Sequence, residues 1–123
     1  MDKQPHGIDG AAAENRELLS PRAAIETVRA AVGSWEGVTT SEHRFGEIEF
    51  RHGRRELGHL HGTFADLPFP RRVRDELIAT GRAAPHHVLP ESGWVNTPMR
   101  TASEVASVIE LFRQNYLRGR TGA

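Results

Sequence analysis

The sequence predicts an α+β fold, with a single antiparallel or mixed twisted sheet of about five strands and helices packed on one face. The prediction rests on segments with apolar residues at helical spacing and on segments with alternating or β-branched residues. Their order along the chain is α-β-β-β-α-β-β-α, and 123 residues suit one domain. We expect this domain at 15–118, between a flexible N-terminal tail at 1–14 and a C-terminal tail at 119–123.

The first helix is predicted to begin at Ser20-Pro21, where an N-cap residue precedes a proline at the first helical position. A start nearer Asn15 is the alternative, and Gly33 is a typical end. The inward stripe at helical spacing consists of Ile25, Val28 and Val32.

Three strands are expected next, at 35–43, 47–51 and 55–61, with the last two joined in a hairpin by a turn at Gly53-Arg54. A regular period of two in the third strand places Leu57, His59 and His61 on one face. The same period places Glu56, Gly58 and Leu60 on the opposite face.

The segment that begins at Asp66 reads as a turn that becomes a helix near Pro70 and ends at Gly81. Two short strands, 86–89 and 94–97, are expected on either side of a turn at 90–93. The last helix begins at the capping box formed by Thr101 and Glu104.

Composition limits the possible functions. Lys+Arg and Asp+Glu both number 16, and this zero net charge disfavours wholesale nucleic-acid binding. There is no cysteine, which excludes disulfides, thiol catalysis and zinc–thiolate sites. No apolar run is long enough to span a bilayer, and the first residues lack the apolar region of a signal peptide. We therefore expect a cytoplasmic protein without a membrane partner.

The histidines are the main candidates for a site. His59 and His61 share a strand face, so their rings can converge on one ligand, and His86 or His87 can join them if the strands are neighbours. Asp66 or Glu91 could add a carboxylate. Three interpretations remain open: a His-bound metal, a polar pocket without a metal, and a purely structural role. No cofactor is predicted, and the metal is the minority alternative.

Three further residues could line or shape such a recess. Asp66 could instead cap a turn, Phe69 could be a hydrophobic plug below the helix start, and Trp94 could pack over the sheet. The chain contains no phosphate-binding glycine loop, nucleophile elbow or other recognisable catalytic signature.

A cluster of arginines offers a different kind of site. Their guanidinium groups could form a phosphate-binding face, although interleaved acidic residues favour a solvated surface instead. The arginines are Arg54, Arg55, Arg71, Arg72, Arg74 and Arg82.

Several motifs together resemble the small bacterial and fungal domain family labelled "luciferase", over roughly residues 40–117. They are His59-x-His61, Asp66-Leu67-Pro68, the Arg-Asp helix start, Pro85-His86-His87 and Ser92-Gly93-Trp94-Val95. The label implies a light-emitting oxygenase, a luciferase-type oxidoreductase.

A weaker similarity is to the MmcQ/YjbR group, through Arg44-Phe45-Gly46, Gly93-Trp94-Val95 and Asn115-Tyr116. This similarity implies a frataxin-like sheet with helices on one side, and binding to DNA.

The leading hypothesis is a small-molecule site in a recess lined by histidines and Trp94, with Asp66 and Phe69 shaping its mouth. The alternative is a nucleic-acid or protein-interaction module that uses the arginine surface.

Overall fold

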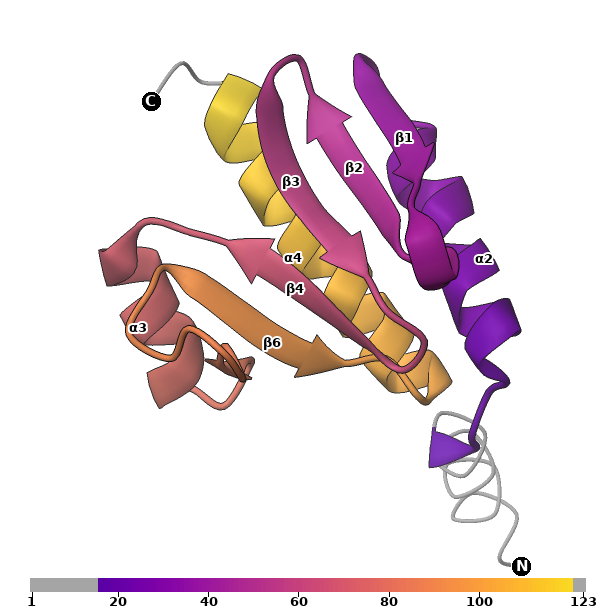
Figure 1. The fold of residues 1–123 in the computed structure, drawn as a ribbon. Helices are drawn as coiled ribbons and strands as arrows, with labels where there is room; N and C mark the ends of the chain where they lie inside the picture. The colour runs from indigo at the N-terminus through magenta and orange to yellow at the C-terminus, as the bar shows by residue number, and fades with distance from the viewer. Residues whose placement is uncertain (1–15, 121–123) are drawn as a thin grey trace, which may run out of the picture.

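The computed structural model describes residues 16–120. Its elements are α2 (Pro21–Gly33), β1 (Val38–Glu42), the short 3-10 turn η1 (Arg44–Gly46), β2 (Ile48–His52), β3 (Arg55–Leu60), β4 (Phe64–Pro68), α3 (Arg71–Ala79), β5 (Ala84–Pro85), β6 (Trp94–Pro98) and α4 (Ala102–Arg120) (Figure 1). The expected N-terminal tail lies outside the described residues. Of the expected C-terminal tail, residues 119 and 120 belong to α4 and the rest lies outside. Within 16–120, no helix has the length and apolar character needed to cross a membrane.

The predicted α+β class is confirmed. All six strands form one antiparallel sheet in the order β1-β2-β3-β4-β6-β5. The expected count of about five strands missed β4, because its Asp and Pro residues are typical of turns. The segment nevertheless pairs with β3 and β6 and buries Ala65 and Leu67 on its inner face. Burial and strand pairing therefore outweigh the turn propensity.

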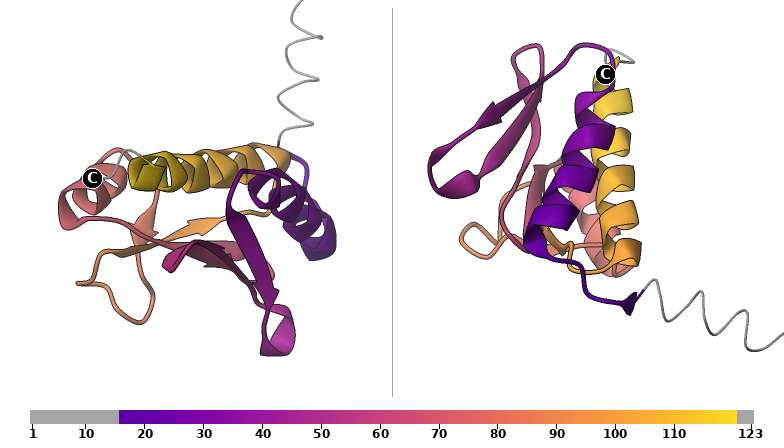
Figure 2. Two further views of the ribbon diagram at one scale, coloured as in Figure 1. Left: turned by 90° about the horizontal axis from the view of Figure 1, so that it is seen from above. Right: turned by 90° about the vertical axis from the view of Figure 1, so that its right-hand side faces the viewer.

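The helices lie on one side of the sheet. Figure 2 shows α2 and α4 side by side against this face, with α3 at the end of the same layer. Within residues 16–120 the opposite face carries no α-helix, and the loop between β5 and β6 projects from that side (Figure 2). The sheet therefore has one covered face and one free face, which we call the helix-free face.

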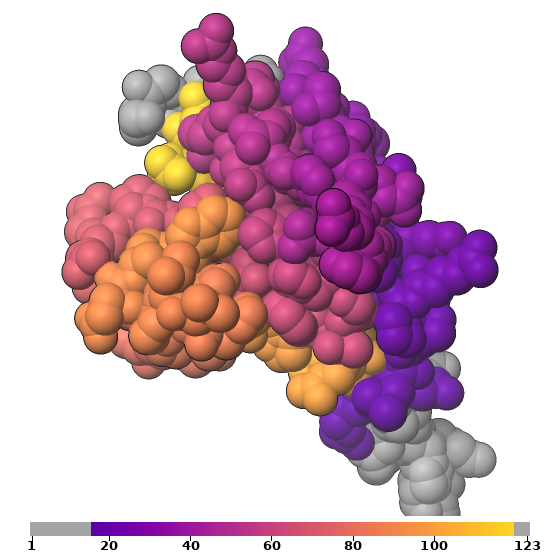
Figure 3. Space-filling view, viewed as in Figure 1, coloured from indigo at the N-terminus to yellow at the C-terminus, as the bar shows by residue number. Residues whose placement is uncertain are grey.

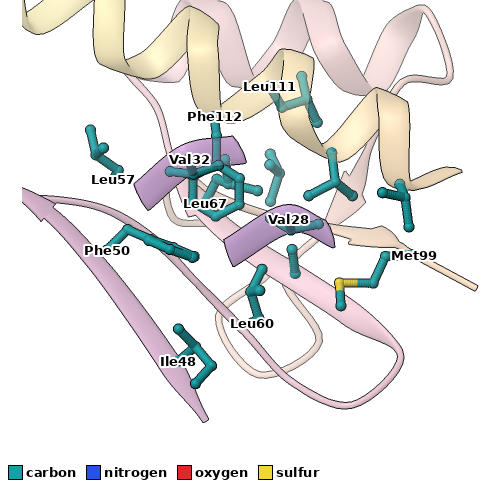
Figure 4. Close-up of a cluster of buried hydrophobic side chains, with 14 of the residues drawn as sticks. Val28, Val32, Ile48, Phe50, Leu57, Leu60, Leu67, Met99, Leu111 and Phe112 are labelled. Carbon is teal, nitrogen blue, oxygen red and sulfur yellow. The ribbon is translucent and has the colours of Figure 1, made fainter. Parts of the chain in front are cut away.

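The core lies between the sheet and the two longer helices (Figure 4). Val28 and Val32 of α2 and Phe112 of α4 are fully buried, and the ring of Phe112 meets Phe50 edge to face at a centroid distance of 5.2 Å. The predicted start of α2 is confirmed, since the Ser20 side chain accepts a hydrogen bond from the Ala23 amide.

The start of α4 is also close to its prediction. The Glu104 amide donates to Thr101 Oγ1, and Glu104 Oε1 accepts from the Arg100 amide. The reciprocal bond of the capping box thus reaches one residue further back than the standard pattern.

A β-bulge in β3 overturns the predicted side-chain alternation. Phe50 pairs with Gly58 and Arg51 pairs with Glu56, which leaves Leu57 as an extra residue. Leu57 consequently faces the core, whereas Glu56 lies on the same face as His59. The extra residue is the physical reason why a strict period of two fails here.

Asn115 of α4 fastens this bulge to the core. Its fully buried amide donates to the carbonyls of Leu57 and Pro68, both at 3.0 Å, and its Oδ1 accepts from Arg55 and Arg118 at 2.9 and 2.7 Å. One side chain therefore holds β3, β4 and α4 together below the helix-free face.

Gly58→Ala is expected to destabilise the protein by about 2 kcal/mol or more. Gly58 has φ +147°, and a Cβ there would lie 2.7 Å from the Asp66 carbonyl and 2.8 Å from the Phe112 ring. Urea unfolding measures the effect. The matched control is Gly62→Ala, because a Cβ at Gly62 meets nothing within 4 Å. Equal stability of the two variants would show that the bulge needs no glycine.

Candidate functional site

Asp66 lies at the centre of the helix-free face. It pairs with His59 of β3 on one side and with Asn96 of β6 on the other. Although this face carries no helix, the Asp66 side chain is only 1% exposed. Its Oδ1 accepts a hydrogen bond of 2.9 Å from Asn96 Nδ2, which leaves Oδ2 directed at other partners.

Four histidines surround Oδ2 of Asp66. The Nε2 atoms of His59, His61, His86 and His87 lie at 3.5, 3.1, 3.5 and 3.6 Å from it. His59 lies in β3 and His61 directly follows this strand, whereas the other two belong to the β5–β6 loop. The structure thus brings together the two histidine pairs that the sequence singled out.

The route by which His86 and His87 reach Asp66 differs from the prediction. Residues 86–89 are not a strand, because pairing stops at Pro85 and the chain turns over the sheet face. Both imidazoles can therefore face Asp66, and their rings stack at a centroid distance of 4.4 Å. The expectation that only one of the two adjacent histidines could face the cluster is wrong for this reason.

Two arginines of α3 hold this loop in place. Arg71 donates to the Glu91 carbonyl at 2.7 Å, and Arg74 donates to the Pro90 carbonyl. On the other side of the loop, the Phe69 amide donates to the Gly93 carbonyl at 3.0 Å. These bonds join the loop to the segment around the start of α3.

The remaining arginines of the predicted basic face lie in other environments. Arg55 donates to the side chain and carbonyl of Asn115. Arg82 lines a separate hollow with Glu104 and Glu110. Arg54 and Arg72 are exposed. Three of the six guanidinium groups, those of Arg55, Arg71 and Arg74, thus donate hydrogen bonds to other parts of the chain.

Sequence reasoning missed three polar residues at the cluster. Glu47 Oε2 lies 3.5 Å from His61 Nε2 and 3.9 Å from His59 Nε2. Glu56 Oε2 lies 2.8 Å from His59 Nδ1, and Asn96 binds Asp66 as described above. Asn96 could have been found as the residue two positions after Trp94, on the same face of the strand. Glu56 could not, because the bulge reverses its side.

An open recess of about 420 Å³ lies over this cluster. Its lining consists of His59, His61, Asp66, His86, His87, Val88, Leu89 and Trp94. Figure 3 is viewed onto this face, where the orange segment that carries the loop borders the β3 and β4 region. Trp94 forms a wall, with ring centroids 5.3 Å from His59 and 6.2 Å from His86.

A second hollow of about 360 Å³ shares His61 with the first and is bordered by Phe45 and Glu47. Two candidate residues lie elsewhere. Phe69 is 5% exposed and belongs to the core instead of the recess lining, and Glu91 contributes its carbonyl to the Arg71 bond.

The pKa values of His59 and Asp66 are both shifted toward the charged forms of these side chains. Burial by itself would lower the pKa of His59, but hydrogen bonds to Asp66 and Glu56 and the charges of Glu56 and Glu47 raise this pKa to about 10. Burial would likewise raise the pKa of Asp66, but hydrogen bonds from His59 and Asn96 and the nearby His86 and His59 lower it to about 2. In the absence of any ligand, an imidazolium and a carboxylate therefore share the floor of the recess at neutral pH.

The donor atoms are also close enough to share a metal ion. Glu47, His59 and His61 form one group, and Asp66, His86 and His87 form another, each with ligand atoms within 4.8 Å of one another. The Oδ2 contacts of Asp66 link the two groups.

Fold and site together define a small α+β domain with a recess of histidines and carboxylates on the free face of an antiparallel sheet. The family model described as Luciferase domain matches residues 54–115, about half of the chain. The chain belongs to this family. The matched range contains Asp66, Trp94 and all four clustered histidines, whereas Glu47 precedes it. Neither a curated protein nor a solved structure matches the chain. The similarity to the MmcQ/YjbR group stays a prediction.

The titration of the cluster can be measured by NMR in the presence of a chelator. We expect Asp66 to titrate near pH 2 and His59 near pH 10. Because the folded pKa of Asp66 lies below its unfolded value, its contribution, on the order of 2 kcal/mol, is present above about pH 4 and lost as the pH falls to 2. The folded pKa of His59 is raised, so its contribution is present below about pH 6.5 and lost as the pH rises to 10.

Glu56→Gln is the matched variant for this measurement. It removes a carboxylate 2.8 Å from His59 Nδ1 and should lower the His59 pKa while leaving the fold intact. A His59 that titrates at its ordinary pKa in the unsubstituted protein would contradict this account of the cluster.

Proposed function

We propose that this domain binds a small molecule in the recess over Asp66. The ligand has an apolar body that contacts Trp94, Val88 and Leu89, and a polar group that reaches the histidines and Asp66. The observation that carries this proposal is the combination of an apolar wall and a charged floor around one buried carboxylate. Concave sites with a few convergent polar groups and shifted pKa values are the usual form of small-molecule sites.

Exposed apolar side chains at the rim support the proposal. Phe45, Val88 and Leu89 are 97%, 67% and 52% exposed, and each borders one of the two hollows that meet at His61. Phe45 also has φ +67°, a left-handed conformation that is unusual for a bulky residue. A ligand that covers these side chains would remove apolar surface from water, at about 25 cal/mol per Å².

The arginine surface supports a nucleic-acid function less well. Arg71 and Arg74 are turned toward loop carbonyls, and Arg55 toward Asn115. The zero net charge adds no long-range attraction to a polyanion.

The recess can be tested with the apolar fluorescent probe 8-anilinonaphthalene-1-sulfonate. In a Trp35→Phe background, Trp94 is the one remaining tryptophan, so energy transfer from it reports a probe bound near the recess. We expect saturable energy transfer. We expect Leu89→Asp to weaken probe binding by about tenfold, because the probe loses its apolar contact with Leu89, which contributes about 1.4 kcal/mol.

Leu117→Asp is the control, because Leu117 is an exposed leucine of α4 in the helix layer. Circular dichroism verifies that each variant is folded. Probe binding that is equally strong in the Leu89→Asp and Leu117→Asp variants would overturn the recess as the binding site.

A further inference from the structure

We propose that the floor of the recess is a binding site for one divalent first-row transition-metal ion. His59, His61 and Asp66 are its core ligands, Glu47 and His87 flank them, and His86 is a hydrogen-bond donor to Asp66 that does not bind the ion. This inference concerns the same recess as the proposed function, but it does not depend on an organic ligand.

The separations between donor atoms fit a shared ion. Ligands about 2.0–2.2 Å from an ion in tetrahedral or octahedral geometry lie about 3.0–3.5 Å from one another. Asp66 Oδ2 is 3.1 Å from His61 Nε2 and 3.5 Å from His59 Nε2. Glu47 Oε2 is 3.5 Å from His61 Nε2 on one side, and His87 Nε2 is 3.6 Å from Asp66 Oδ2 on the other. Small rotations of side chains suffice to bring these atoms around one ion.

Neighbouring groups orient two of the core ligands. Glu56 holds Nδ1 of His59 at 2.8 Å, so the ring keeps its proton on Nδ1 when a bound ion replaces the proton on Nε2. The lone pair of Nε2 then faces the cluster. Asn96 holds Oδ1 of Asp66 and leaves Oδ2 for an ion. Carboxylates and amides that fix the far side of a ligand in this way are typical of metal sites in proteins.

Backbone hydrogen bonds exclude His86 from the ligand set. The amides of Val88 and Leu89 donate to its Nδ1 at 3.1 and 3.0 Å. A backbone amide can only donate, so Nδ1 carries the lone pair and the proton of the neutral ring is on Nε2. This N–H points at Asp66 Oδ2 and cannot coordinate an ion while it keeps its proton. His86 is therefore a positioning residue that supports the Asp66 carboxylate.

The donor set selects the class of ion. Two or three imidazoles with one or two carboxylates suit zinc, iron, cobalt or manganese, whereas calcium and magnesium prefer oxygen ligands alone. The chain has no cysteine that could offer a thiolate. The 2-His-1-carboxylate core also leaves coordination positions that face the open recess.

Equilibrium dialysis of the untagged, chelator-treated protein against Zn²⁺, Co²⁺ and Mn²⁺ tests the site directly. We expect one ion per chain for at least Zn²⁺ and Co²⁺, and a loss of affinity of more than a hundredfold in the His61→Asn and Asp66→Asn variants. His86→Asn is the matched variant, since the Asn Oδ1 can accept the same two amide bonds while Nε2 is removed. We expect its affinity to fall by only about tenfold, because it loses a hydrogen bond to Asp66 and not a ligand of the ion.

NMR of the unsubstituted protein gives a second test that needs no variant to fold. Long-range ¹H–¹⁵N spectra show which ring nitrogen carries a proton. On addition of Zn²⁺, the Nε2 signals of His59 and His61 should shift as ligands, while His86 should keep its proton on Nε2. Failure to bind any of the three ions, or binding that is unchanged in the His61→Asn variant, would overturn the metal site. A zinc-bound His86 would overturn its assigned role.

A Leu89→Ser variant, which shortens the apolar side chain without adding a carboxylate to the recess, separates this proposal from the proposed function. Metal binding should be unchanged in this variant, because Leu89 lies on the wall and not on the floor. Metal bound without any binding of the fluorescent probe would refute the small-molecule recess alone. Probe bound without metal would refute the metal site alone.

Discussion

A carboxylate buried on the free face of a sheet is the constraint on which the site depends. Asp66 is 1% exposed, and its charge would be costly there without partners. Asn96 satisfies one oxygen and the histidines surround the other. Each of these groups occupies its position because a strand, the turn after β3 or the β5–β6 loop brings it there. The cluster is therefore a property of the sheet pairing and of the loop together.

The core and the site are connected through the bulge in β3. The extra residue lets Leu57 enter the core while Glu56 and His59 share the helix-free face. Asn115 binds the carbonyl of the extra residue, so the same buried amide that joins α4 to the sheet also supports the strand that presents His59. A substitution deep in the helix layer can thus disturb the site without contacting it.

The sequence was sufficient for the fold class, the cap of α2 and the importance of the histidine pairs, because local patterns determine these features. It was insufficient for β4, where burial of Ala65 and Leu67 decides against the turn propensity of Asp66 and Pro68. It was also insufficient for Glu56, whose face depends on a bulge, and for Glu47, which meets His61 only because β2 pairs with β3. Side chains that meet only through strand pairing or an irregular loop leave no signal at fixed spacing.

The arginines at the start of α3 could serve an external ligand or bind another part of the same chain. Cations in the first turn of a helix oppose the helix dipole, so arginines at this position need compensating partners. In the structure, the partners of Arg71 and Arg74 include the carbonyl oxygens of Glu91 and Pro90. The favourable bonds offset the dipole, and they fix the loop to the start of α3. Half of the histidine cluster is on that loop. Arg71 and Arg74 therefore contribute to the recess by holding the loop that carries His86 and His87 over Asp66, so two arginines of the predicted basic face support the histidine site.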